Sequence, residues 1–150
     1  MDCRHARRGG SVRPAIGADA GGATQFTEKT GGVGVSGRAA TIDYGDFQKV
    51  DVRVGTVTRV ESYPEARRPA YKLWVDLGAE IGTRKTSAQI TAHYTPEALL
   101  GRQVAAVINF PPKQIGRFMS EILVLGFPDA KGEVVLISPE HPVPNGGKMF

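Results

Sequence analysis

One helix signature stands alone in a chain whose other patterned segments have the spacing of short strands. Thr95 precedes Pro96, and Gly101 follows Leu99 and Leu100. This order supplies a threonine N-cap, a proline at the first helical position and a glycine after the last turn. We therefore expect one short helix here. Its place among the strands limits the folds that the chain can adopt.

Five segments alternate apolar and polar residues or form a short apolar run, as strands do. They are residues 50–60, 71–77, 84–90, 103–110 and 121–127, with a further short extended piece at 133–137. The single helix falls between the third and fourth strands. This order predicts an all-β chain: a five-stranded OB-fold barrel with a short helix between strands three and four and terminal appendages.

Two details refine the expected barrel. Gly55 interrupts the alternation of the first strand, which indicates a bulge or a sharp bend. Asp43 or Asp46 is expected to cap one helical turn before that strand, and Phe47 and Val50 are expected to join the core. In the second strand Leu73 and its alternate neighbours form the apolar face, which leaves Trp74 on the more polar one.

Residues 1–42 are expected to form a disordered, basic, glycine-rich tail before a folded domain at 43–150. Nine of the 19 glycines lie in residues 1–40, with six Lys or Arg against three acidic residues. Scattered single apolar residues there cannot offset the entropy of ordering the chain. Three interpretations remain open: an arm that strengthens binding to polyanions, an unstructured leader, or a start codon assigned upstream of the true one.

Composition excludes several classes of function. Cys3 is the only cysteine, and His5, His93 and His141 lie far apart in the chain, so neither a disulfide framework nor a metal site is indicated. No nucleophile or nucleotide-loop motif is present. We expect no enzyme, no cofactor, no membrane insertion and a cytoplasmic location.

A binding function fits better, because cations and aromatic residues converge on one side of the predicted barrel. OB-folds bind their ligands with the loop between strands one and two, the loop between strands four and five, and the face of strands two and three. Phosphates of an RNA would meet the cations in these places. The candidate RNA-binding residues are Arg67, Arg68, Lys72, Arg84, Lys85, Lys113 and Arg117.

The same region suggests a second ligand class, because apolar side chains alternate with the cations. An apolar peptide segment would contact Phe110, Phe118, Met119 and Trp74. Structural interpretations stay open: the phenylalanines and the methionine could plug the barrel end or a dimer seam, and Trp74 could lie at an interface. Polar residues nearby could instead fix the loops without touching a ligand: Ser87, Gln89, Asn109, Ser120 and Glu121.

Apolar residues occupy both faces of the C-terminal strands, in segments 104–108, 122–125 and 134–137. A single-layer barrel has only one interior, so the outer faces need cover. We predict a homodimer, most simply about a two-fold axis. The alternative is cover by the chain's own terminal segments.

Several motifs resemble a known family. Segments 51–55, 94–102 and 120–121 resemble the tRNA-binding domain appended to some aminoacyl-tRNA synthetases. Segments 64–67, 87–91, 109–116 and 142–146 resemble more closely the stand-alone CsaA proteins, and the likeness covers about residues 44–150. The synthetase-linked modules usually carry a Ser-Gly pair where this chain has Ser87 and Ala88.

The resemblance implies an OB-fold homodimer that binds tRNA. It also implies an alternative function, that of an export-related chaperone binding apolar segments of unfolded preproteins. Under the first reading the basic loops neutralise phosphates, and under the second the aromatic residues hold peptide.

Overall fold

A computed structural model describes residues 37–150, and the predictions made for residues 1–36 lie outside this range. Residues 37–42 are exposed and carry neither helix nor strand. The elements, in chain order, are α1 (Tyr44–Gln48), β1 (Val52–Tyr63), β2 (Ala70–Asp76), β3 (Thr83–Ala88), α2 (Pro96–Leu99), β4 (Gln103–Val107), β5 (Lys113–Ile115), β6 (Phe118–Ser120), β7 (Leu123–Val124), β8 (Gly126–Pro128) and β9 (Val134–Leu136).

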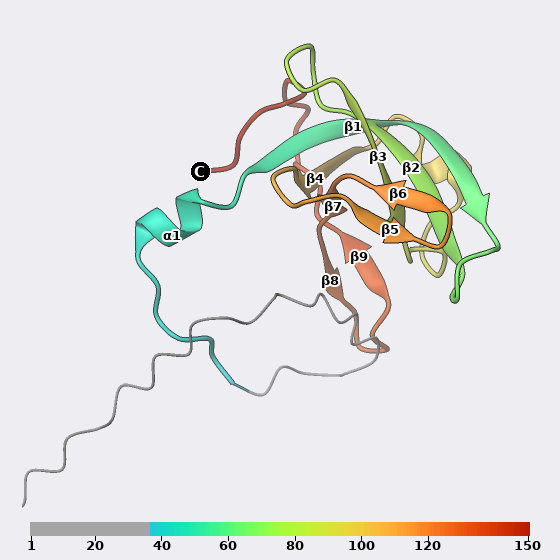
Figure 1. The fold of residues 1–150 in the computed structure, drawn as a ribbon, viewed down its shortest axis with the longest axis horizontal. Coiled ribbons are helices and arrows are strands. Elements are labelled where there is room, and N and C mark those ends of the chain that lie inside the picture. Colours follow the sequence, from blue (N-terminus) through green and yellow to red (C-terminus); the bar gives the residue numbers. More distant parts are fainter. Residues whose placement is uncertain (1–36) are drawn as a thin grey trace, which may run out of the picture. The chain divides into compact units, whose positions relative to one another are not determined.

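A curled five-stranded antiparallel sheet forms the body of the domain, in the order β3-β2-β1-β4-β7 (Figure 1). The helix α2 lies between β3 and β4 in the chain. Two short hairpins, β5–β6 and β8–β9, complete the fold. The predicted all-β, OB-like fold is confirmed, including the place of its helix.

The caps expected at both helices are present. Asp43 accepts a hydrogen bond from the Asp46 N–H at 2.8 Å, and Thr95 accepts one from the Ala98 N–H at 3.3 Å. Gly101 adopts a left-handed φ of 77° and its N–H donates to the Val57 carbonyl at 2.8 Å. The end of α2 is thereby joined to β1.

The long strand β1 carries the curvature. Its register with β2 shifts between Val57 and Arg59, which marks a β-bulge. The sequence predicted a bulge or bend at Gly55, but there β2 instead passes close to the backbone of β1. A Cβ at this position would lie 2.5 Å from Val75 Cγ1 and 2.8 Å from the Asp76 carbonyl oxygen. The glycine lets β2 pass close to β1, and the bulge itself comes later in the strand.

The core lies inside the curled sheet and under α2. Val57, Leu73, Val75, Leu99 and Val104 are fully buried in it, and burying such a side chain stabilises a fold by roughly 1.5–3 kcal/mol. Leu73 and Val75 face inward while Trp74 between them is only half-buried, so the two faces of this strand were predicted correctly.

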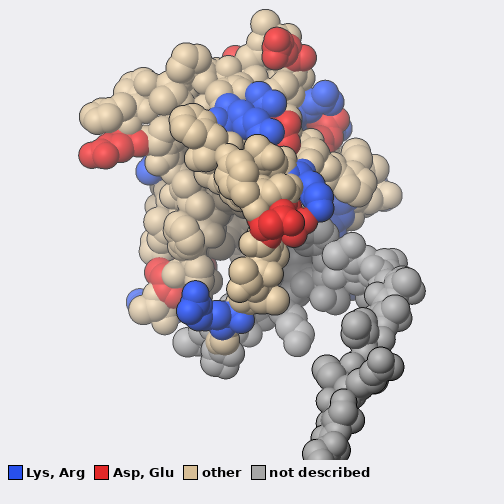
Figure 2. All heavy atoms as spheres, turned by 90° about the vertical axis from the view of Figure 1, so that its left-hand side faces the viewer, with Lys and Arg blue, Asp and Glu red and all other residues tan. Residues whose placement is uncertain are grey.

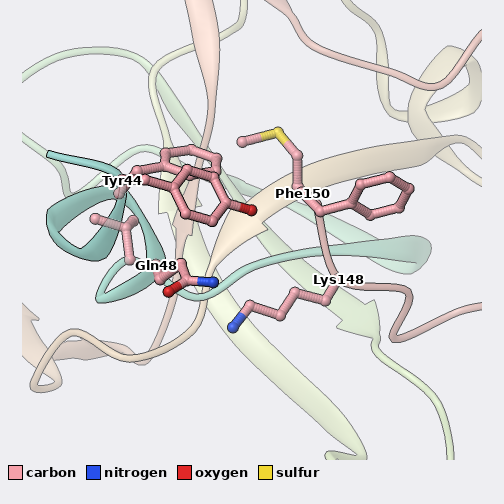
Figure 3. A pocket seen from close by; sticks show the side chains of 7 residues that line it. Tyr44, Gln48, Lys148 and Phe150 are labelled. Carbon is pink, nitrogen blue, oxygen red and sulfur yellow. The ribbon is translucent and has the colours of Figure 1, made fainter.

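The prediction that Phe47 and Val50 join the core is wrong. The helix α1 buries no residue, and Val50 remains 38% exposed. These side chains instead line an open pocket of about 240 Å³ with the C-terminal residues Lys148, Met149 and Phe150. Figure 3 shows side chains of α1 facing Lys148 across this gap. The physical reason is that α1 precedes the sheet and buries none of its residues.

The segment 142–149 lies against the beginning of β1. The Gly146 N–H donates to the Val54 carbonyl at 2.8 Å, the Val54 N–H to the Gly147 carbonyl at 3.0 Å, and the Met149 N–H to the Val52 carbonyl at 2.9 Å. The Asn145 amide oxygen accepts from the Thr56 hydroxyl at 2.8 Å. We call residues 142–149 the C-terminal segment. Its backbone pairs with the first residues of β1.

Residues 109–127 form more structure than the expected loop and single strand. Lys113 pairs with Ser120 and Ile115 with Phe118, so the expected loop contains the β5–β6 hairpin. The expected fifth strand is divided between β7, which pairs with β4, and β8, which pairs with β9. The hairpin forms because Gly116 adopts a left-handed φ of 61° at its turn.

The β8–β9 hairpin extends away from the five-stranded sheet (Figure 1). At its turn the Asp129 carboxylate accepts hydrogen bonds from the Glu133 N–H at 2.9 Å, the Lys131 N–H at 2.8 Å and the His93 ring at 2.7 Å. The bond from Glu133, followed by that from His93, lowers the pKa of Asp129. The ionised carboxylate thus joins the hairpin to the segment before α2.

Candidate nucleic-acid interface

Three side chains form a row across the outer face of the sheet. Trp74 in β2 lies directly opposite Arg59 in β1 and Lys85 in β3. Residues opposite one another in antiparallel strands share a face, so all three leave the sheet on the side away from the core. The row places a tryptophan between two cations.

An aromatic cluster lies beside this row. The ring centroids of Tyr63 and Phe118 are 6.0 Å apart, and those of Trp74 and Phe118 are 6.0 Å apart at an edge-on angle of 77°. Ala70 completes a small second core below the β5–β6 hairpin. Tyr63 is 1% exposed and its hydroxyl donates to the Ile115 carbonyl at 2.6 Å, which fixes the hairpin over the sheet.

Cations cover the rings of this cluster. The Lys72 ammonium lies 4.5 Å from the Tyr63 ring centroid, and the Lys85 ammonium lies 5.4 Å from that of Phe118. The Arg59 guanidinium carbon lies 4.6 Å from the Trp74 centroid. Each contact is a cation–π interaction worth about 0.5–1 kcal/mol at exposed sites. We call Arg59, Tyr63, Lys72, Trp74, Lys85 and Phe118 the cation–aromatic patch.

The structure brings together some of the predicted RNA-binding residues and separates others. Lys72 and Lys85 belong to the patch. Arg67 and Arg68 are exposed in the loop between β1 and β2, and Lys113 and Arg117 are exposed on the β5–β6 hairpin, so both cationic loops keep solvent access. Arg84 is opposite Val75 and therefore leaves β3 on the other side from Lys85.

The predicted peptide-binding residues differ in their access. Phe118 is 9% exposed and packs inside the aromatic cluster, where its partners are the chain's own residues. Trp74 is half-buried in the same cluster, Phe110 is half-buried and Met119 is exposed. Met119 is thus the most accessible apolar side chain of this set.

Polar residues near the patch join strands. The Glu121 carboxylate accepts from the Lys85 N–H at 3.1 Å, and the Glu121 N–H donates to the Lys85 carbonyl at 2.8 Å. The Ser120 hydroxyl lies 3.0 Å from the buried Thr86 hydroxyl, which donates to the Ile122 carbonyl at 2.8 Å. These bonds close the barrel between β3 and the segment after β6.

The other three polar candidates lie elsewhere. Asn109 accepts from the Asp51 N–H at 3.0 Å and donates to the Lys49 carbonyl at 2.6 Å, so it fixes the entry to β1. Ser87 and Gln89 are half-buried in and just after β3. Their side chains make no hydrogen bond to the described part of the chain.

Arg59 and Thr86 were missed by sequence reasoning. Before the bulge Val57 faces the core, and after it Arg59 faces Trp74 and Val60 faces Leu73. The extra residue changes which positions face outward, so strict alternation does not locate Arg59. The out-of-phase valines Val57 and Val60 were the available signal.

Not every cation of this fold is available to a ligand. Arg53 donates to the Asp51 carboxylate at 2.7 Å and to the Gly146 carbonyl at 3.0 Å. The hydrogen bond that Arg53 donates to Asp51 raises the pKa of Arg53. Figure 2 views the side on which α1 and the C-terminus lie, where basic and acidic side chains are interspersed.

Among residues 37–150 no three His, Cys, Asp or Glu side chains are grouped so that they could hold a metal ion. In the same range no helix is long and apolar enough to cross a membrane.

Comparisons with known proteins agree with this fold. A family model described as "Putative tRNA binding domain" matches residues 52–148. The solved chaperone CsaA of Bacillus anthracis is 49% identical, with a TM-score of 0.70, over 74% of this chain and 100% of that one. The solved CsaA chaperone protein of Picrophilus torridus is 44% identical, with a TM-score of 0.69, over 73% of this chain and 100% of that one.

More distant likenesses are found in longer proteins. The methionine–tRNA ligase of Porphyromonas gingivalis is 36% identical over 111 residues, which are 74% of this chain and 16% of the ligase. That of Chloroherpeton thalassium is 39% identical over 100 residues, or 14% of its length. The chain therefore spans about a sixth of these ligases.

Proposed function

The chain belongs to the tRNA-binding domain family, and from that premise we propose that it is a non-catalytic protein of the CsaA type that binds tRNA. The observation that carries the proposal is the cation–aromatic patch, which two exposed basic loops adjoin at Tyr63 and Phe118. Because the chain matches only a small part of the methionine–tRNA ligases, their ligase activity is not transferred to it. We propose that it acts in the cytoplasm without a cofactor.

The arrangement suits a folded RNA. Arg67 and Arg68 on one loop and Lys113 and Arg117 on the other present exposed cations next to the patch. Contacts to phosphates supply most of the affinity of such complexes and position the RNA, while aromatic groups contact its bases. The loops would therefore hold the backbone of tRNA.

The salt dependence of tRNA binding tests this proposal. We expect affinity for tRNA to fall steeply as salt rises, because bound phosphates release counterions. The double variant Lys113→Ala, Arg117→Ala should bind more weakly and lower the slope of log K against log salt by about one for each lost contact. Filter binding between 50 and 300 mM salt measures both quantities.

Lys131→Ala is the matched control for this titration. Lys131 is an exposed cation on the β8–β9 turn, outside the two basic loops. Its removal should leave the slope unchanged. A slope that is equal in the wild type and in the double variant would contradict the assignment of the hairpin cations.

A second function, binding of apolar segments of unfolded preproteins, is supported by exposed Met119 and by the two similar solved proteins, which are described as chaperones. Binding of this kind depends on apolar burial and is nearly independent of salt. A signal-like apolar peptide in the same titration separates the two functions. Competition between peptide and tRNA would mean one shared surface.

We also propose that the protein is a homodimer. Leu123, Phe127 and Val135 are exposed on β7, β8 and β9, and Phe127, which is 68% exposed, lies directly opposite Val135. Such an apolar patch favours a partner, and a second copy satisfies it by symmetry.

Sedimentation should therefore give twice the mass of one chain at micromolar concentration. Phe127→Asp should yield monomers, because a charge in an apolar interface loses its hydration. Leu100→Asp changes an exposed apolar residue at the end of α2 and should remain dimeric. A monomeric wild type would refute the dimer.

A further inference from the structure

We propose that Trp74 is a stacking platform for one unpaired RNA base, and that Arg59 covers this platform until RNA draws it to a phosphate. The inference rests on the proposed RNA-binding function and specifies the ligand: a single-stranded or looped-out nucleotide. It assigns a role to two residues, Arg59 and Glu61, that the sequence patterns left unused.

The geometry of Trp74 suits a platform. Its indole is half-buried on the outer face of β2, and the edge-on contact with Phe118 holds the ring in one orientation. Below Phe118 the second core fixes Tyr63 and the β5–β6 hairpin. The ring thus packs against Phe118, and the group 4.6 Å from its centroid is a surface guanidinium.

Arg59 is a removable cover. Its side chain is 63% exposed and forms an ion pair with Glu61, whose side chain is 40% exposed. Exposed ion pairs and exposed cation–π contacts are each weak. A phosphate offers the guanidinium a stronger, bidentate partner than the contacts it would leave.

Glu61 opposes the binding of RNA in this arrangement. Its carboxylate neutralises Arg59 in the free protein, and its register partner in β2 is Lys72, a second cation of the patch. An RNA phosphate must replace the carboxylate at Arg59. Removing the negative charge of Glu61 should therefore raise affinity, whereas removing Arg59 should lower it.

The spacing favours an unpaired nucleotide. Arg59 and Lys85 lie on the two strands that flank the strand of Trp74. Neighbouring strands are about 4.8 Å apart, so the backbone of each cation lies about that far from the backbone of Trp74. A base stacked on the indole would have its two flanking phosphates near these cations. The bases inside an A-form duplex expose no face to such a ring, so paired RNA cannot use the platform.

Trp74 is the only tryptophan of the chain, so its fluorescence reports stacking directly. Titration of the full chain with a single-stranded uridine decamer should quench the emission, and the same RNA as a duplex with its complement should not. Trp74→Leu should lower affinity for the labelled single strand about 10- to 100-fold, whereas Trp74→Phe keeps a ring and should retain most of it.

Charge variants test the removable cover. Glu61→Gln should bind the single strand several-fold more tightly, and Arg59→Ala several-fold more weakly with a smaller salt slope. Lys49→Ala is the matched control: Lys49 is also an exposed cation paired with a carboxylate, that of Asp46, but it lies in the α1 region. This control should leave binding unchanged.

The outcomes separate this inference from the proposed function. If tRNA binds with a salt slope but the fluorescence does not change and Trp74→Leu binds normally, the platform is refuted and tRNA binding stands. If the single strand quenches Trp74 while tRNA does not bind, the platform stands and the tRNA proposal fails. If neither RNA binds, both fail. Glu61→Gln binding no better than the wild type refutes the cover.

Discussion

Replacing Tyr63 with alanine is expected to lower the free energy of unfolding by about 3–5 kcal/mol, as deletion of a buried aromatic ring does. Tyr63 is 1% exposed and contacts Phe118 and Ala70 in the second core. Its loss leaves a cavity under the β5–β6 hairpin and removes the hydroxyl that holds the Ile115 carbonyl. Denaturation by urea, followed by circular dichroism, measures the change.

Tyr63→Phe separates the ring from its hydroxyl. This variant loses only the hydrogen bond to Ile115, which contributes about 0.5–1.5 kcal/mol. Tyr44→Ala is the surface control, because Tyr44 is exposed on α1, and surface changes are usually within about 0.5 kcal/mol. A Tyr63→Ala variant as stable as Tyr44→Ala would mean that the hairpin does not depend on the second core.

The second large effect is expected at Gly146. This residue has a φ of 85°, and an added Cβ would lie 2.5 Å from the Leu77 carbonyl oxygen. Gly146→Ala should therefore lower the free energy of unfolding for two reasons. A left-handed backbone costs alanine about 1–2 kcal/mol, and overpacking against Leu77 costs about 1–3 kcal/mol. We expect the C-terminal segment to separate from β1, which would expose the Val54 carbonyl.

Gly132→Ala isolates the backbone contribution. Gly132 has the same φ of 85°, but an added Cβ there meets nothing within 4 Å. The free energies of unfolding of the two variants, measured with denaturant, should therefore differ by the cost of the steric contact with Leu77. Equal destabilisation by both variants would show that the C-terminal segment moves away from Leu77 at no cost in stability.

Only the first of these two sites lies at the proposed interface. Tyr63 holds the hairpin that presents Lys113 and Arg117, so Tyr63→Ala should also reduce the salt slope of tRNA binding. Gly146 holds the C-terminal segment at the start of β1, beside the pocket of α1. Its substitution should affect stability more than RNA binding.

Local features of this protein were determined by its sequence alone. The caps at Asp43 and Thr95 act through hydrogen bonds to residues three positions away, so a few neighbouring residues suffice to predict them. Alternation in β2 assigned Leu73 and Trp74 to opposite faces, since no bulge interrupts that strand. The order of strands around one helix then predicted the fold.

Only the tertiary structure decided how distant segments meet. The bulge after Val57 turned Arg59 toward Trp74, and burial under the β5–β6 hairpin placed Phe118 and Tyr63 in one cluster. Phe47 remained outside the core and lines a pocket with residues about 100 positions later, Lys148, Met149 and Phe150, which no local pattern connects to α1. Alternation and caps report contacts within one element, whereas the cation–aromatic patch depends on register and close approach between elements far apart in the chain.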